Sequence, residues 1–139
     1  MAVFNKFDQF GADAMHGVHN LGSHDIAVML SNVAPVRTNK VKADITEIAA
    51  GNGYVAGGIV ANRVSSGQVA GVYSLILSPV QWTAVSGSIA TFQYSIIYNK
   101  TAAAGNLIGW YDYGAPVIIT SGNNFLENLD QVNGLIKFQ

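Results

Sequence analysis

The chain contains 139 residues, with 7 Lys and Arg against 8 Asp and Glu, so its formal net charge is −1. Only 11% of its side chains are charged, whereas an ordinary soluble domain has about 25%. Half of the residues are apolar, so the composition excludes a disordered chain and the strongly basic surface of a nucleic-acid-binding protein. The absence of cysteine excludes disulfides, thiolate metal sites and cysteine nucleophiles.

The residue types predict one β-rich domain. Val and Ile together number 27, against 8 Leu, and β-branched side chains pack well on a pleated sheet but lose rotamer freedom in a helix. A chain of this length can bury a core without a metal or a disulfide. No apolar run is long enough to span a membrane, and the first residues do not resemble a secretory signal. We therefore expect a protein that is made in the cytoplasm and has no membrane partner.

The N-terminal segment, residues 1–24, is predicted to be a helix or an arm outside the main domain, residues 25–139. Apolar residues recur in it at spacings of three and four, as in an amphipathic helix: Phe4, Phe7, Phe10, Ala14 and Val18. Because this stripe lies close to the end of the chain, we expect Phe4, Phe7 and Phe10 to contact another subunit.

The remaining chain predicts a series of short strands. In residues 25–31, Ile26, Val28 and Leu30 alternate with Ala27 and Met29, and from residue 59 onward apolar segments are separated by turn residues about ten apart. Segment 44–48 fits either one helical turn or a short strand. The sequence predicts a jelly-roll-like sandwich of two sheets, with an immunoglobulin-like sandwich as the alternative and a small barrel third. The predicted strands are 25–31, 59–65, 71–77, 81–84, 89–98, 107–113, 116–120, 124–129 and 134–138.

The three histidines are the only candidate metal ligands with close spacing. His16, His19 and His24 lie within nine residues, and Asp25 follows directly. Their spacing matches neither a metalloprotease helix nor a zinc finger. We therefore expect these side chains to form polar packing contacts, with no metal and no cofactor bound.

Other apparent motifs also favour a structural interpretation. Residues 51–56 formally fit the glycine-rich dinucleotide-binding pattern, but Gly57 and Gly58 follow where a helix should begin, so a turn is expected. The aromatic cluster at 110–113 could form a sugar-binding platform with Trp82 and Tyr98. Core or interface packing is favoured instead, because such rings bury large areas. Trp110 and Tyr113 are therefore predicted as interface anchors, and no catalytic residues are predicted.

Glycine and aromatic landmarks recur along most of the chain. They are Phe4-Asn5-Lys6-Phe7, Gly17-Val18-His19-Asn20-Leu21, Ala43-Asp44-Ile45-Thr46-Glu47-Ile48, Gly51-Asn52-Gly53-Tyr54, Trp82-Thr83-Ala84, Gly87-Ser88-Ile89, Tyr98-Asn99-Lys100-Thr101 and Leu107-Ile108-Gly109-Trp110-Tyr111-Asp112-Tyr113-Gly114. Together these landmarks resemble short virion proteins of tailed bacteriophages. The resemblance implies a non-enzymatic cement or decoration protein on the capsid exterior, which would bind the major capsid protein and copies of itself as a dimer or trimer. A tail or adaptor component, or a carbohydrate-binding module in host adsorption, is the alternative.

Overall fold

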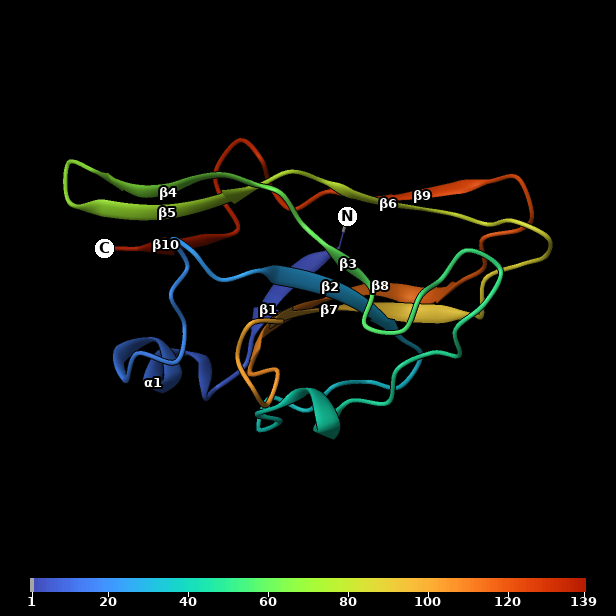
Figure 1. Ribbon diagram of the computed structural model, residues 1–139, viewed down its shortest axis with the longest axis horizontal. Coiled ribbons are helices and arrows are strands. Elements are labelled where there is room, and N and C mark those ends of the chain that lie inside the picture. Colours follow the sequence, from blue (N-terminus) through green and yellow to red (C-terminus); the bar gives the residue numbers. More distant parts are fainter. Residues whose placement is uncertain (1) are drawn as a thin grey trace.

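The computed structural model describes residues 2–139, and 43% of the chain is in strands and 7% in helices. Figure 1 shows the elements in two layers. They are β1 (Val3–Lys6), α1 (Phe10–Met15), β2 (Ile26–Ser31), the 3-10 turn η1 (Lys42–Asp44), β3 (Ile59–Val60), β4 (Arg63–Val69), β5 (Val72–Leu77), β6 (Val80–Thr83), β7 (Phe92–Asn99), β8 (Leu107–Val117), β9 (Asn124–Glu127) and β10 (Ile136–Phe138).

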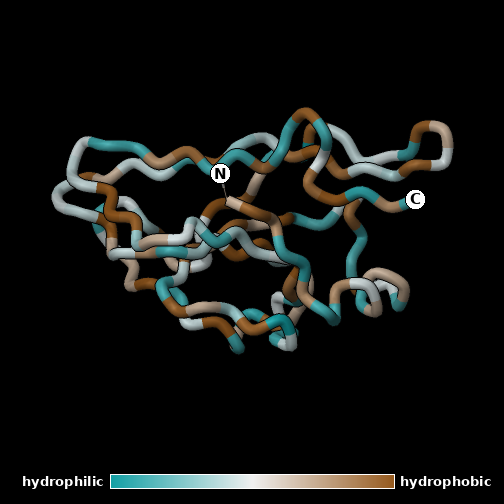
Figure 2. Tube along the Cα trace, turned by 180° about the vertical axis from the view of Figure 1, so that it is seen from behind, coloured by the Kyte–Doolittle hydropathy of each residue, from teal (hydrophilic) through white to brown (hydrophobic). Residues whose placement is uncertain are grey.

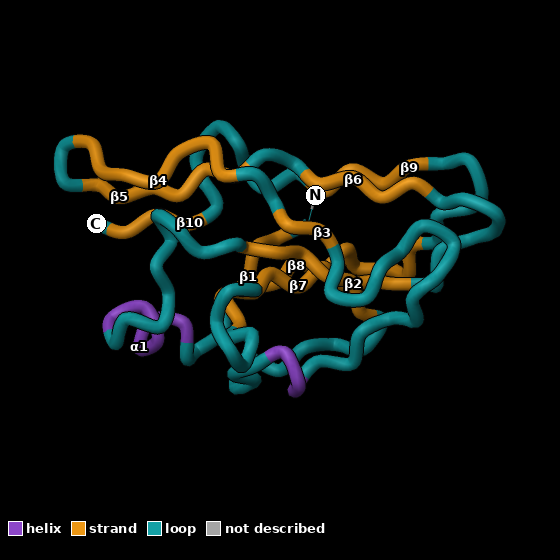
Figure 3. The backbone as a smooth tube through the Cα atoms, viewed as in Figure 1, coloured by secondary structure: helices purple, strands orange, loops and turns teal. Residues whose placement is uncertain are grey.

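The strands form an antiparallel sandwich. One layer is a five-stranded sheet in the order β1-β8-β7-β2-β3, and the other contains the sheets β10-β5-β4 and β6-β9 (Figure 3). This confirms the predicted β-rich, sandwich-like fold. In the five-stranded sheet β1 pairs with β8 and β2 with β7. Such nested pairing is consistent with a jelly roll, which stays a prediction at the level of detailed topology.

The centre of the five-stranded sheet, β2 with most of β7 and the first half of β8, is buried on both faces. All six residues of β2 are buried, with Ile26, Val28 and Leu30 in the core between the layers and Ala27 and Met29 in a second cluster on the outer face. The loop that contains η1 runs below this outer face in Figure 1. Apolar residues therefore recur along both layers and the connecting loops (Figure 2). The alternation predicted for residues 25–31 is confirmed, and a chain with few charges can fill both clusters.

The prediction of an N-terminal helix or arm outside the main domain is wrong for the start of the chain, which joins the five-stranded sheet. Residues Val3–Lys6 form the edge strand β1 on β8, and the helix α1 has only six residues. Phe7 and Phe10 are 1% and 6% exposed, so the chain's own core covers them. Three phenylalanines spaced three apart do not distinguish one long helix from a strand, a turn and a short helix in succession. The second arrangement is favoured because the backbone of β1 then forms hydrogen bonds with the backbone of β8.

Other predicted boundaries also differ. Segment 107–113 and the start of segment 116–120 form one strand, β8, which ends at Val117, and a register shift in its pairing with β7 lets the strand bend and continue. Segment 59–65 is divided between β3 and β4, which belong to different layers. Segment 44–48 was expected to be either a helical turn or a short strand. Its first residue, Asp44, is the last residue of η1, and Glu47 then forms an isolated β-bridge with Ser31.

The position of β1 depends on Gly109. A Cβ atom at this residue would lie 2.5 Å from the carbonyl oxygen of Asn5 and would overlap the ring of Phe4. Real Cβ atoms do not approach backbone this closely, so a side chain at position 109, opposite Lys6, would push β1 away from β8. Glycine at this position is therefore a requirement of the N-terminal strand.

We expect Gly109→Ala to destabilise the protein by about 1–3 kcal/mol, the usual cost of overpacking. Gly11→Ala is the matched control. Gly11 lies in α1 with no atom within 4 Å of an added Cβ, so this change should be neutral or stabilise by up to about 1 kcal/mol. Urea unfolding measures both, and equal stability of the two variants would contradict the assigned role of Gly109.

Candidate functional site

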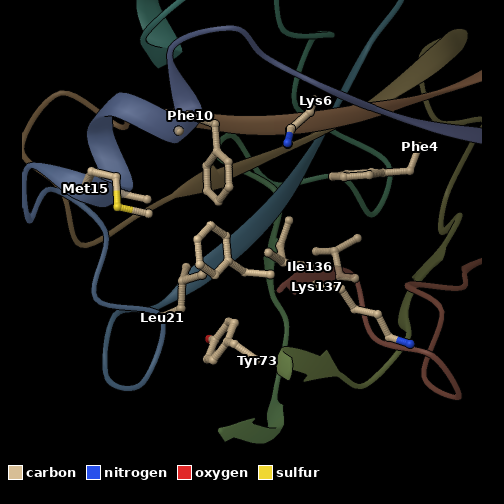
Figure 4. Close-up of a pocket in the computed structure, with 12 residues that line it drawn as sticks. Phe4, Lys6, Phe10, Met15, Leu21, Tyr73, Ile136 and Lys137 are labelled. Atoms are coloured by element: carbon tan, nitrogen blue, oxygen red, sulfur yellow. The ribbon is translucent and has the colours of Figure 1, made fainter. Parts of the chain in front are cut away.

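One candidate site is an apolar groove between the N-terminal elements and the three-stranded sheet. Its volume is about 580 Å³. Phe4 and Phe10 form one side, while Tyr73 of β5 and Ile136 of β10 lie across from them (Figure 4). We refer to this feature as the apolar groove.

Strand pairing holds the two walls of the apolar groove in place. The pairing of β1 with β8 places Phe4, and the antiparallel pairing of β10 with β5 sets Ile136 opposite Leu75 and Phe138 opposite Tyr73. Along β10 the residues differ in burial: Ile136 belongs to the core, while Lys137 and Phe138 face solvent. The groove is therefore bounded by backbone that is fixed in both layers.

Large apolar side chains at the apolar groove are open to solvent. Met15 is 67% exposed and Phe138 is 58% exposed. Among the described residues that line the groove, the charged ones are Lys6 and Lys137, one from each wall, and none is acidic. An open apolar surface with a cationic rim is typical of a surface that another molecule covers.

The structure separates the five predicted interface residues. Phe4 is half-buried and lines the apolar groove, and Phe10 forms part of its buried wall. Phe7 and Trp110 instead stack on each other in the second core cluster, with ring centroids 4.6 Å apart. Tyr113 is half-buried and packs edge-to-face on Phe92 and Phe125. Phe7 and Trp110 are therefore core residues and are removed from the candidate interface.

The sugar-binding alternative required tryptophan rings exposed to solvent, and the structure does not provide them. Trp82 is 2% exposed and Trp110 is 8% exposed, so neither offers the open face of a ring on which a sugar could stack. Tyr98 is also buried, and its hydroxyl donates a hydrogen bond to the carbonyl of Gly57 over 2.7 Å. These rings stabilise the fold in the way predicted for packing aromatics.

Two of the histidines join a polar network around Asn99. The side-chain oxygen of Asn99 accepts hydrogen bonds from the backbone N–H groups of Thr101 and Ala102, over 3.0 and 3.1 Å. Its amide nitrogen therefore faces the rings, at 3.1 Å from Nδ1 of His19 and 2.9 Å from Nδ1 of His24. Because that nitrogen is a donor, both Nδ1 atoms accept and carry no proton. These hydrogen bonds join His19 and His24, which precede β2, to Asn99, the last residue of β7.

His16 takes no part in this network and is exposed. Within residues 2–139, no three His, Asp or Glu side chains are grouped closely enough to hold a metal ion. The expected polar role is thus seen directly for His19 and His24. We expect a chelator of divalent ions to leave the melting temperature unchanged, and a fall of several degrees that zinc or nickel restores would contradict this.

The network should make stability depend on pH. Burial lowers the pKa of His19, Asp13 opposes this change and His24 adds to it. The unfolded chain therefore takes up a proton at a higher pH than the folded one, and stability is lost as pH falls below about 6.5. Between pH 7.5 and 5.5, wild type should lose unfolding free energy relative to His19→Gln, while the exposed-site control His16→Gln should follow wild type in urea titrations.

The glycine-rich segment forms the expected turn. The hydroxyl of Tyr54 donates to Glu47 Oε1 over 2.6 Å and accepts from the N–H of Leu30 over 3.0 Å. The same Glu47 oxygen accepts the backbone N–H of Gly57 over 2.5 Å. These bonds tie the loop to β2, and no helix N-terminus follows for a phosphate.

Comparison of the chain with family models, curated proteins and solved structures found no match. Among the described residues, no helix is long and apolar enough to cross a membrane. The walls of the apolar groove come from residues that are far apart in sequence, and sequence reasoning found only Phe4 and Phe10 among them. Tyr73 and Phe138 carried no separate signal, because each fits an ordinary alternating strand.

Proposed function

We propose that this protein is a non-enzymatic component of a tailed-phage virion, a capsid cement or decoration protein that binds the outer shell and stabilises contacts between major capsid subunits. The observation that carries the proposal is the apolar groove, which leaves Met15 and Phe138 largely exposed in a single chain. The resemblance of the sequence landmarks to phage virion proteins supports the same role.

The chemistry of the groove supports a protein partner. Covering Phe138 or Met15 would contribute about 1.5–3 kcal/mol for each side chain that becomes fully buried. Lys6 and Lys137 on the two walls favour a partner segment with a carboxylate next to its apolar side chains. Because these lysines are exposed, their contribution is small, and attachment should depend weakly on salt.

Copies of the chain are the second proposed partner, as a dimer or trimer. The edge strand β4 is mostly exposed, and Val64 and Val69 on it are 53% and 80% exposed. An open edge strand presents unpaired backbone groups to another chain. This edge lies in the same sheet as β10, which borders the apolar groove.

The test is attachment of purified protein to particles that lack it. Phe138→Glu and Met15→Glu should each weaken attachment by about tenfold or more, since they replace an apolar contact by a charge. Val85→Glu is the matched control, because Val85 has the same exposed fraction as Phe138, 58%, and does not line the groove. Co-sedimentation measures binding, and thermal unfolding checks that each variant folds.

The function itself is tested on the particles. A shell that binds the protein is stabilised by the free energy of binding, summed over many copies. Particles without the protein should therefore release their genome at a lower temperature, and added wild-type protein should restore resistance where Phe138→Glu does not. Particles without the protein that are equally heat-resistant but fail to join a tail would support the tail or adaptor alternative instead. Failure of such particles to adsorb to cells would support the host-adsorption alternative.

A further inference from the structure

A second cavity lies on the other side of Phe4 and is lined by acidic and aromatic side chains. Its volume is about 440 Å³. Phe4 of β1 and Tyr111 and Tyr113 of β8 contribute rings, while Glu127, the last residue of β9, and Asp130 in the following loop contribute carboxyl groups. We refer to it as the acidic cavity.

The acidic cavity holds buried polar atoms without partners. Glu127 is only 2% exposed, and its Oε2 atom makes no hydrogen bond within the described residues. The hydroxyl of Tyr113 is likewise buried and unpaired. Leaving such groups unsatisfied costs about 1–3 kcal/mol each. Among the described residues, the other buried side-chain atoms without a partner are His19 Nε2, Trp82 Nε1 and Ser95 Oγ, and none of these residues lines the acidic cavity. The acidic cavity is therefore lined by two residues, Glu127 and Tyr113, that have unused hydrogen-bonding capacity.

The charges around the acidic cavity have one sign. Burial raises the pKa of Tyr111 to about 12, and the carboxyl groups of Glu127 and Asp130 both contribute to the rise. Both acids therefore act on the same phenol. Within residues 2–139, no Lys, Arg or His side chain lines the cavity to neutralise these carboxyl groups. The faces of Phe4 and Tyr113 are also attractive to a cation.

We propose that the acidic cavity binds a guanidinium or alkylammonium group, held by the Glu127 carboxylate and the rings of Phe4, Tyr111 and Tyr113. The volume admits such a group with its aliphatic stem. An anion is disfavoured because two carboxyl groups line the cavity. A metal ion is disfavoured because the described lining offers two carboxylates, fewer than the oxygen ligands that Ca²⁺ or Mg²⁺ requires. The inference concerns this chain alone and holds whether or not the chain binds a capsid.

Proton release should accompany binding of the cation. Burial raises the pKa of Glu127 to about 8, and the nearby Ser95 hydroxyl opposes part of that rise. At neutral pH the carboxyl therefore holds a proton, which must leave before an ion pair can form. The other titratable groups that line the cavity are Tyr111, Tyr113 and Asp130. From pH 6.5 to 8.5 the affinity for the cation should rise roughly twentyfold by proton linkage.

The experiment titrates the full chain with methylguanidinium chloride at constant ionic strength and follows the ring signals of tyrosine and phenylalanine by NMR. N-methylurea, a neutral molecule of similar shape, is the ligand control. We expect saturable changes at Tyr111 and Tyr113 that strengthen between pH 6.5 and 8.5. No saturable change at pH 8.5, or equal binding of N-methylurea, would overturn the proposal.

Two variants separate the site from general charge effects. Glu127→Gln should abolish the response, and it should fold because the amide resembles the protonated carboxyl in shape. Asp25→Asn removes the same charge from an exposed side chain outside the cavity and should bind like wild type. Retained binding in Glu127→Gln, with a normal melting temperature, would overturn the assignment.

A spermidine titration identifies the source of the cation. A dissociation constant below about 100 µM for spermidine, with methylguanidinium much weaker, identifies a free polyamine as the ligand. Millimolar binding of both identifies an arginine or lysine side chain of a second protein, whose other contacts supply the remaining affinity. Both outcomes support the cation site. If neither spermidine nor methylguanidinium binds, the proposal is contradicted.

Discussion

The pairing of β1 with β8 is the contact on which most of the functional surface depends. It is possible because Gly109 leaves room for the backbone of β1 and for the ring of Phe4. Once β1 is in place, Phe4 lies between the apolar groove and the acidic cavity and lines both. A segment with the apolar spacing of a helix thus becomes the edge of a sheet, and that edge forms walls of two candidate binding sites.

The low charge of the chain has a structural use. A strand that is buried on both faces needs uncharged side chains on both faces. The strand β2 is buried along its whole length and contains no charged residue. The described residues contain a single ion pair, Arg37 with Asp8, and it is exposed, so it contributes little to stability. Stability therefore comes from apolar packing and backbone pairing, and the few acids at the acidic cavity stand out against this background.

Polar groups inside the fold fall into two kinds. Those around Asn99 and Tyr54 are joined to neighbours by hydrogen bonds and connect loops to strands. Among the described residues, Glu127, Tyr113, His19, Trp82 and Ser95 each have a buried side-chain atom without a partner, and Glu127 and Tyr113 line the same cavity. A satisfied network stabilises one conformation, whereas an unsatisfied one costs free energy unless a ligand completes it. What distinguishes the acidic cavity is that two such residues line one open space that a ligand can enter.

Residue type and alternation were enough to predict the β class, most of the strands and the two faces of β2, because burial in a sheet follows a period of two. They also predicted that the histidines and the glycine-rich segment serve the fold. The roles of Phe7, Phe10 and Trp110 were decided by tertiary structure, since a spacing of three or four does not tell whether a segment pairs with a distant strand. The same holds for both cavities, whose walls join β1 to β10 and to the loop after β9. Contacts between residues more than a hundred positions apart leave no local pattern, so only the folded chain brings Phe4, Glu127 and Phe138 into one region.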